Sequence, residues 1–413
     1  MTSSKAQNES NGTKAKKQIL LNAFDMFTVG HLSFGQWRNP KDRAKDKRRD
    51  LTYWTDLAKL LDKGGFVGLF LADTFGPYDT NGSGDEESGL RDYYVYLGRF
   101  GWNIVTSWKE SASKAEDAEN GIYSDYSQIR PIHHHGKFHV DAPFLTDPSP
   151  QRTPVLFQAG TSPYTKLMRN RAGIKFGSTH AEGIFVAGLS PHVVAPRVKA
   201  IREGAIAAGR DPYSVKVFAM ITPIIGKDEE DAKRKYEEAL RYVLIEGGLA
   251  QFSATTGIDV SKFDLDHELT EKDVANHLQR IHSSLYNLRY RGDDVPKLTP
   301  RNLGTVTAIG GNGAMPVGTA AQVADVFQEW VDIADVDGFN VGYVITPGSF
   351  EDAVEYLVPE LRSRGLLPEA IQADAPAPTF REQIYGLGQK GLRSDHPGFK
   401  YKYDTYEETV ARE

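Results

Sequence analysis

The sequence contains no cysteine among its 413 residues. This absence excludes disulfide bonds, thiolate metal sites, iron–sulfur clusters and catalysis by a cysteine nucleophile. The sequence also lacks the signatures of phosphate-binding loops, HExxH zinc proteases and GxSxG serine hydrolases. Chemistry that depends on these groups is therefore not expected in this protein.

Long apolar runs are also missing, because no stretch approaches the ~18 residues that a membrane-spanning helix needs. Residues 1–17 are rich in serine, asparagine and lysine, and they lack the apolar core of a signal peptide. We therefore expect a soluble cytoplasmic protein with a disordered N-terminal tail over residues 1–17.

Basic residues are not in excess, since 49 lysines and arginines face 55 aspartates and glutamates for a net charge of -6. A nucleic-acid-binding protein usually carries a strong basic excess, so neither nucleic acid nor a membrane surface is expected as a partner. A charged stretch over residues 39–50 has nearly balanced signs and is interpreted as a solvated loop.

Apolar runs typical of buried strands alternate with segments of helical periodicity. The strand-like runs are residues 19–24, 66–72, 102–106, 155–159, 183–187, 215–225 and 338–345. The helix-like segments are residues 53–61, 164–172, 191–208, 229–245, 320–333 and 350–364. This alternation predicts an α/β protein with a mostly parallel sheet. A closed (β/α)8 TIM barrel is the first choice, and a doubly wound sheet is the alternative.

Polar residues lie at the ends of four of these strands, where parallel barrels and open sheets bind their ligands. Their amide, hydroxyl and carboxylate groups suit a planar ligand with a polar edge, or a phosphate. His31 follows the first strand and could be a general acid or hydrogen-bond donor, although a structural role is the more common one. The strand-end residues are Asp73, Asn103, Thr106, Ser107, Thr161, Ser162, Thr346 and Pro347.

Three consecutive histidines, His133 to His135, raise the question of a metal site. Adjacent residues on a strand point to opposite faces, so three in a row cannot converge on one ion. We expect no nearby carboxylate or histidine with the spacing to complete a site. An edge strand or loop is therefore favoured, and no metal is expected.

Several motifs together resemble the nitrilotriacetate and dibenzothiophene-sulfone monooxygenase group of the bacterial luciferase-like flavin monooxygenases. They are NAFDMFTVGHLSFGQWR from residue 22, FLAD ending at Asp73, GRFGWNIVTS from residue 98, SPQRTPVLFQAGTS from residue 149 and VDGFNVGYVITPGSFEDAVEYLVPELRSRGLL from residue 336. The segments TFREQIYG and DHPGFKYKY resemble the C-terminal extension of this group. The similarity runs with gaps from residue 19 to residue 401.

This resemblance implies a (β/α)8 barrel of the luciferase type over residues 18–370 and a C-terminal extension over residues 371–413. It implies a two-component system, in which a separate NAD(P)H:flavin reductase supplies reduced FMN. The reduced flavin meets O2 in a dry pocket, and the resulting flavin hydroperoxide oxygenates a small organic substrate. The group tends to form homo-oligomers. Its members differ widely in substrate, so the substrate does not carry over.

The motif match also assigns residues to the flavin site. Asp73 should lie by the flavin ring, with Asn103 beside it. His31 is the candidate catalytic residue. The residues expected around the ring or its phosphate are Ala159, Gly160, Thr161 and Ser162.

The sequence departs from this group in two places, near residues 80–98 and 108–150. In the first, residues 81–96 replace an apolar helix, a strand with a threonine-rich turn and a second helix. In the second, a helix that bears a tyrosine and a histidine is absent. The third strand and about three helices are therefore missing from the expected barrel. They normally supply a threonine, a histidine and a tyrosine to the flavin site.

Three hypotheses follow from these observations. The first is an FMN-dependent monooxygenase, either intact in nature or descended from active enzymes. The second is a catalytically dead or misannotated truncated paralogue that acts, if at all, as a binding module. The third is a barrel oxidoreductase that uses a deazaflavin for hydride transfer, which the C-terminal extension and the first motif disfavour.

Overall fold

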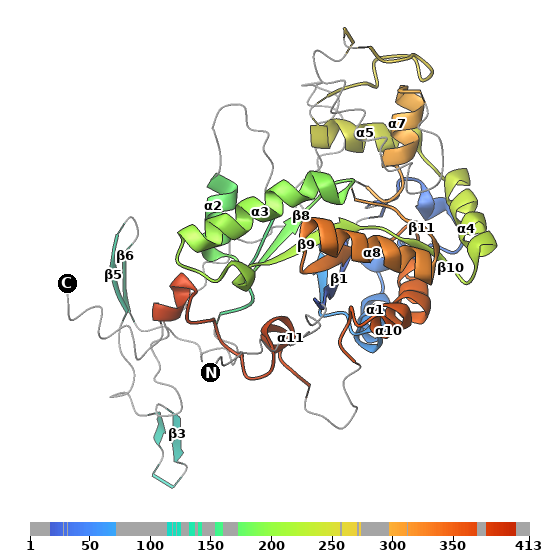
Figure 1. Ribbon diagram of the computed structural model, residues 1–413. Coiled ribbons are helices and arrows are strands. Elements are labelled where there is room, and N and C mark those ends of the chain that lie inside the picture. Colours follow the sequence, from blue (N-terminus) through green and yellow to red (C-terminus); the bar gives the residue numbers. More distant parts are fainter. Residues whose placement is uncertain are drawn as a thin grey trace, which may run out of the picture.

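At the centre of the computed structural model lies a six-stranded parallel sheet (Figure 1). The structure describes residues 17–27, 29–30, 32–71, 114–117, 119–120, 122–124, 132–136, 139–142, 153–159, 172–256, 258–270, 272–273, 297–311, 313–369 and 377–401. The strands of the sheet are β1 (Leu20–Asp25), β2 (Gly68–Leu71), β7 (Phe157–Ala159), β8 (Gly183–Val186), β9 (Lys216–Ile221) and β12 (Gly338–Val341).

The order of these strands identifies the sheet as part of a barrel. Across the sheet the order is β2-β1-β12-β9-β8-β7, and every neighbouring pair is parallel. The first strand therefore pairs with the last, with Leu20 opposite Gly338. That pairing is the closing contact of a (β/α)8 barrel. The predicted TIM barrel is confirmed and the doubly wound alternative was wrong. The described sheet contains six strands of the eight.

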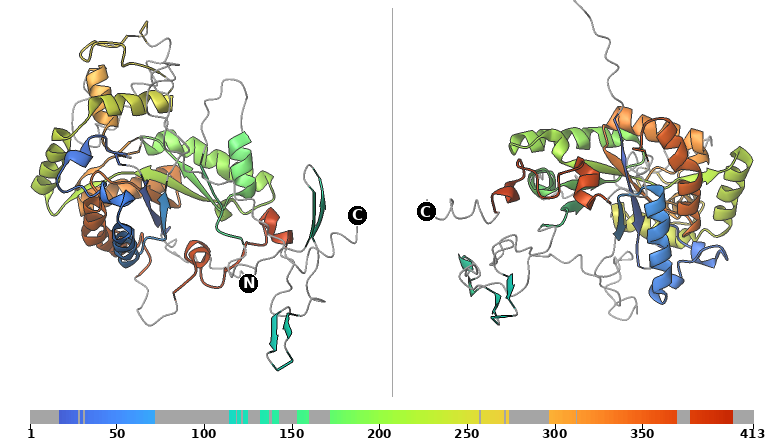
Figure 2. Two further views of the ribbon diagram at one scale, coloured as in Figure 1. Left: turned by 180° about the vertical axis from the view of Figure 1, so that it is seen from behind. Right: turned by 90° about the horizontal axis from the view of Figure 1, so that it is seen from below.

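Helices cover the outer face of this sheet, as Figures 1 and 2 show. In α1, the side chain of Asp50 accepts the amide of Thr52, and Gly65 ends the helix in the left-handed conformation. In α8, Thr319 and Gln322 form a capping box. The covering helices are α1 (Leu51–Gly64), α2 (Ala172–His180), α3 (Pro191–Ala207), α8 (Ala320–Ala334) and the consecutive α9 (Gly348–Asp352), η6 (Ala353–Leu357) and α10 (Val358–Ser363).

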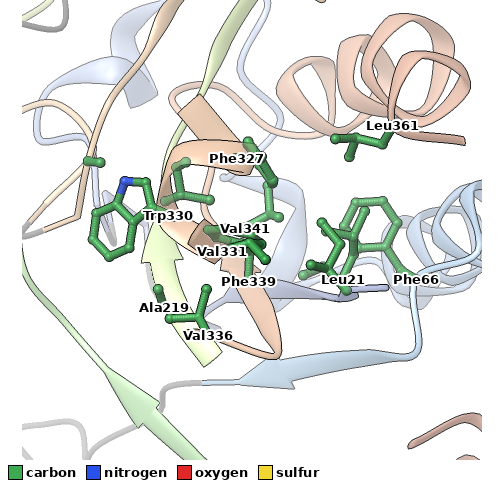
Figure 3. Packing of buried hydrophobic residues seen from close by; sticks show 14 of the residues in the cluster. Leu21, Phe66, Ala219, Phe327, Trp330, Val331, Val336, Phe339, Val341 and Leu361 are labelled. Carbon is green, nitrogen blue, oxygen red and sulfur yellow. The ribbon is translucent and has the colours of Figure 1, made fainter. Parts of the chain in front are cut away.

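The main hydrophobic core lies between this outer face and the helices (Figure 3). Leu21 and Val341 belong to it from the sheet, and Leu361 belongs to it from α10. The ring of Phe339 on β12 lies 4.3 Å from that of Phe327 on α8, centroid to centroid. Each such side chain contributes about 1.5–3 kcal/mol by leaving water. Alternate strand residues point the other way, into the barrel.

Between β9 and β12 the chain departs from the predicted elements. The strand predicted over residues 215–225 is interrupted at Pro223, because proline has no amide hydrogen for the ladder. A second strand, β10 (Ile224–Gly226), follows it and pairs in parallel with β11 (Val317–Thr319). The strand predicted over residues 338–345 likewise ends early, at Val341.

The helix predicted over residues 229–245 ends at Arg241, as α4 (Glu229–Arg241). Two further helices, α5 (Ile245–Thr256) and α7 (Pro300–Thr307), were missed. Both contain small and polar residues at positions where a helical apolar period was sought. They lie apart from the sheet, at the top of Figure 1.

The two expected gaps are described only in part. Residues 80–98 lie outside the described residues. So does the helix predicted over residues 164–172, except for its last residue, Ala172, which begins α2. Within residues 108–150 the structure contains two antiparallel hairpins. Their strands are β3 (Lys114–Asp117) with β4 (Ile122–Ser124), and β5 (Ile132–His135) with β6 (His139–Ala142).

The described part of the C-terminal extension packs against the amino-terminal end of β8. It contains α11 (Phe380–Tyr385) and the short helix η7 (Pro397–Tyr401). From α11, Arg381 forms a buried ion pair with Glu182, the residue that precedes β8. The division into a tail, a barrel and an extension stays a prediction. No helix in the described ranges is both long and apolar enough to cross a lipid bilayer.

Candidate active site

The carboxyl ends of the six parallel strands meet at one edge of the curled sheet, which is where barrels bind their ligands. Of the predicted cofactor residues, Ala159 is placed at this edge, as the exposed last residue of β7. Gly160, Thr161 and Ser162 follow it directly in sequence but lie outside the described residues.

The remaining predicted site residues also lie outside the described residues: His31, Asp73 and Asn103, together with Thr106 and Ser107. The structure describes the strands that precede the first two of them, since β1 ends at Asp25 and β2 ends at Leu71. Their meeting at the carboxyl edge therefore stays a prediction.

Thr346 was expected to offer its hydroxyl at a strand end, and this expectation was wrong. β12 ends five residues earlier, and Thr346 is fully buried. Its hydroxyl forms a hydrogen bond with the hydroxyl of Tyr53 on α1. Its neighbour Pro347, joined by a cis peptide bond, lines a surface cleft instead.

Phenylalanine rings line the inner face of the sheet. The rings of Phe70 on β2 and Phe185 on β8 lie 4.3 Å apart, although β1, β12 and β9 stand between their strands in the sheet order. Phe24 stacks on Phe70 at 5.5 Å, and Phe157 stacks on Phe185 at 5.2 Å. The sheet is therefore curled until its two ends face each other. These four rings are half-buried, so they present an apolar, aromatic wall.

Two asparagines add polar atoms to this interior. Asn22 on β1 lies opposite Asn340 on β12, and the two residues are 2% and 3% exposed. Within the described part of the chain, neither side-chain oxygen accepts a hydrogen bond. Leaving a buried acceptor unpaired costs about 1–3 kcal/mol. Both oxygens are therefore suited to a donor that enters the barrel.

Loops beyond the strand ends form the mouth of the barrel, which we define by Ser33, Thr222, Gly310, Gly342 and Tyr343. The Ser33 hydroxyl donates to the Tyr343 carbonyl at 3.2 Å and accepts the Gly310 amide at 3.3 Å. Thr222 donates its hydroxyl to the Gly310 carbonyl at 3.2 Å. A Cβ atom on Gly342 would lie 2.5 Å from the Thr222 hydroxyl. The two loops that carry Thr222 and Gly342 can therefore approach this closely only because residue 342 is glycine.

An ion pair lies next to the mouth with both side chains fully buried. The Lys47 ammonium contacts the Asp25 carboxylate at the end of β1. It also donates to the Tyr343 hydroxyl at 2.6 Å and to the Met26 carbonyl at 3.4 Å. The Tyr53 hydroxyl donates to the second Asp25 oxygen at 3.2 Å. This cluster joins three chain segments at the carboxyl edge.

The electrostatics of the cluster follow from its burial. Burial raises the pKa of Tyr343 well above its usual value, and the Asp25 carboxylate raises it further. The same two causes, in the same order, raise the pKa of Tyr53. Both phenols therefore stay protonated at neutral pH. Burial also raises the pKa of Asp42, which accepts the Thr346 amide at 3.1 Å.

Sequence reasoning missed this cluster because Asp42 and Lys47 belong to the charged stretch of residues 39–50. That stretch was interpreted as a solvated loop, whereas the two residues are 8% and 1% exposed. Balanced charges do not distinguish a solvated loop from one that crosses a buried carboxylate. The one sequence signal for the cluster was Asp25, the aspartate that ends the first strand, because a carboxylate at the end of a buried strand needs a partner.

The consecutive histidines form β5 of a two-stranded hairpin, so the edge-strand interpretation is confirmed. A carboxylate does lie beside these histidines. Asp141 on β6 lies 2.9 Å from His133 Nδ1 and 3.2 Å from His135 Nε2. Among the described residues, no group of three or more His, Cys, Asp or Glu side chains is placed to hold a metal.

A cleft of about 380 Å3 opens between α4, the start of α9 and the loop after β1. Its charged side chains pair with one another, as with Lys41 and Glu238 at 2.7 Å and Lys235 and Asp352 at 2.8 Å. Because these charges are already satisfied, the aromatic interior and its mouth are the stronger candidate site.

Comparison with known proteins shows the family of this chain. A family model described as luciferase-like monooxygenase matches residues 93–336. Dimethyl-sulfide monooxygenase of Hyphomicrobium sulfonivorans is 33% identical over 96% of this chain and 96% of that protein. The crystal structure of DmoA from the same organism has a TM-score of 0.77, with 32% identity over 93% of this chain and 96% of that chain.

Two further relatives are similar over most of their length. Long-chain alkane monooxygenase of Geobacillus thermodenitrificans is 30% identical over 94% of this chain and 98% of that protein. Nitrilotriacetate monooxygenase component A of Aminobacter aminovorans is 25% identical over 85% of this chain and 94% of that protein.

The alignments also bear on the expected gaps. The alignment with the dimethyl-sulfide monooxygenase spans 483 positions, although this chain has 413 residues. The relative therefore has many residues without a counterpart here. This length difference agrees with the two places where the sequence departs from the family pattern.

Proposed function

Since this chain belongs to the luciferase-like monooxygenase family, we propose that it uses reduced FMN and O2 to insert one oxygen atom into a small organic molecule. The observation that carries this proposal is the aromatic interior of a barrel whose sequence matches monooxygenases along most of its length. The cofactor belongs to the proposal, because the structure contains protein alone.

The described residues fit a flavin. The isoalloxazine ring is flat and largely apolar, and the half-buried rings of Phe24, Phe70, Phe157 and Phe185 offer it a matching wall. The unpaired oxygens of Asn22 and Asn340 offer acceptors inside the same barrel. When bound, reduced FMN supplies the two electrons that activate O2.

The chain's own residues would bind the flavin and exclude water from it. In this proposal Asp73 and Asn103 lie beside the ring, and residues 159–162 hold the ring or its phosphate through amides and hydroxyls. His31 donates a hydrogen bond or a proton at the mouth. The tight closure around Gly342 keeps bulk water from the interior.

The partners follow from the same chemistry. Reduced FMN must come from a separate NAD(P)H:flavin reductase, and the name "component A" of one relative supports a multi-component system. We include a homo-oligomer and a cytoplasmic location in the proposal.

The test combines the purified chain with FMN, a flavin reductase and NADH under isotopically labelled O2. The candidate substrates are dimethyl sulfide and a long-chain alkane, chosen from the names of the relatives. Labelled oxygen in the product, dependent on both the chain and FMN, is the expected result. Hydride transfer from a reduced deazaflavin without any oxygen incorporation with FMN, or no flavin binding by the folded chain, would overturn the proposal.

A second candidate function is a non-catalytic binding module, favoured by the residues that relatives have and this chain lacks. Its prediction is a chain that unfolds cooperatively yet binds neither oxidised nor reduced FMN. Sequencing the transcript across the codons of Tyr78 to Arg99, and again after Ser107, distinguishes an enzyme that is intact in nature from a chain that has truly lost these segments. Coding sequence for the absent segments favours an intact enzyme in nature.

A further inference from the structure

The Lys47 ammonium makes three contacts, which join its own loop to two other segments of the chain. It contacts the Asp25 carboxylate at the end of β1, the Met26 carbonyl at the start of the next loop and the Tyr343 hydroxyl just beyond β12. Lys47 itself comes from the loop that leads into α1. An ammonium has three N–H donors, which matches the three contacts in number.

Tyr343 links this ion pair directly to the mouth. Its hydroxyl accepts from Lys47, while its carbonyl accepts the Ser33 hydroxyl at 3.2 Å. Ser33 in turn accepts the Gly310 amide at 3.3 Å. Tyr343 and Ser33 are each 2% exposed, so neither bond competes freely with water. A displacement of the Tyr343 ring would therefore shift the backbone that holds Ser33.

Stability alone does not explain a fully buried ion pair. Removing both charges from water is costly, and a pair of apolar side chains of similar size often gives a protein of equal or greater stability. What apolar side chains cannot provide is direction, because they contact their neighbours without fixed donors and acceptors. The buried pair at Lys47 is therefore suited to hold a geometry.

We propose that Lys47 is a positioning residue that sets the mouth of the barrel through Tyr343 and Ser33. The proposal rests on the proposed function, in which the mouth keeps water away from the reaction of reduced flavin with O2. Without the ion pair, the mouth opens more often. More O2 is then reduced to hydrogen peroxide instead of entering the product, while the substrate KM changes less than kcat.

The main test replaces both partners at once, as Asp25→Leu with Lys47→Met, so that no charge is left buried without its partner. Lys17→Met is the matched control, because Lys17 pairs with Asp335 at 2.6 Å and Asp337 at 3.2 Å at the opposite end of the sheet. Two quantities are measured: hydrogen exchange of the amides of residues 32–36, and peroxide formed per NADH consumed.

In the double variant we expect cooperative unfolding close to that of the wild type, with exchange at residues 32–36 faster by about tenfold. Peroxide per NADH should at least double, whereas Lys17→Met leaves both quantities at wild-type values. Wild-type exchange and wild-type peroxide yield in a folded double variant would overturn the proposal.

A milder variant, Tyr343→Phe, keeps the ion pair and removes only the hydroxyl that Lys47 contacts. It should accelerate the same exchange by a smaller factor, and unchanged exchange would also overturn the proposal. The exchange measurement needs no flavin. If the wild-type chain consumes no O2 with FMN, the proposed function fails while exchange still decides whether Lys47 positions the mouth.

Discussion

Arg381 in the C-terminal extension donates to both carboxylate oxygens of Glu182, at 2.8 and 2.9 Å, and each side chain is 2% exposed. The guanidinium also donates to the Thr153 carbonyl at 2.8 Å, next to β7. One side chain thus joins the extension to two barrel strands. The extension is therefore part of the folded unit that supports the sheet.

The first prediction concerns this pair. Arg381→Ala leaves a buried carboxylate without its partner, so the free energy of unfolding should fall by about 3–5 kcal/mol. Arg301→Ala is the control, because its pair with Asp266 is largely exposed and screened by water, so its removal should cost far less stability. Urea unfolding followed by circular dichroism measures both. Equal losses in the two variants would contradict the prediction.

The second prediction concerns the contact between α5 and α7. A Cβ atom on Gly248 would lie 1.9 Å from the Gly304 carbonyl oxygen. This oxygen belongs to the backbone, so it cannot move aside as the end of a flexible side chain can. Gly248→Ala should therefore lower the free energy of unfolding by about 1–3 kcal/mol. Gly391→Ala is the control, because nothing lies within 4 Å of its added methyl. Thermal unfolding that leaves both variants at the wild-type midpoint would refute this contact.

The third prediction concerns pH and Asp231 at the start of α4. Burial raises the pKa of this carboxyl. Hydrogen bonds from Arg234 and the Lys227 amide, together with the charge of Lys235, lower the pKa by more than burial raises it, to about 2. Because the pKa is lower in the folded state, the stabilisation is full above the unfolded value of 3.8. It is lost as the pH falls from there through about 2.

Asp231→Asn should therefore lose roughly 1–2 kcal/mol at neutral pH and progressively less as the pH approaches 2. Urea unfolding at several pH values measures the difference from the wild type. A constant difference between wild type and Asp231→Asn at every pH would contradict the assignment.

The fourth prediction concerns the proposed flavin site. Asp73→Ala should weaken FMN binding by about tenfold, the equivalent of one lost charge-assisted hydrogen bond of ~1.4 kcal/mol. The far-UV circular dichroism should not change. Titration of the flavin fluorescence measures the affinity, with Asp56→Ala as a control of equal charge. Unaltered affinity would remove Asp73 from the site.

His31→Ala tests the catalytic role of His31 in the oxygen-incorporation assay, where we expect slower turnover. Normal turnover would return His31 to a structural role.

Much of the barrel could be predicted from the sequence because its signals are local. Buried parallel strands are continuous apolar runs, as in residues 183–187, and helices have capping residues such as Thr319. Where local signals conflict, the prediction failed. Pro223 divides an apolar run into β9 and β10, and the short helices α5 and α7 were missed.

The sequence alone determined the class of the chain, an α/β barrel without cysteine chemistry whose motifs match flavin monooxygenases. Those features depend on residue type and spacing, which the sequence contains in full. Only the tertiary structure decided that β1 pairs with β12, that Phe70 faces Phe185 and that Lys47 is buried against Asp25. Each of these contacts joins residues that are separated in the chain. Which residues meet depends on how the sheet curls, and no local sequence pattern encodes that.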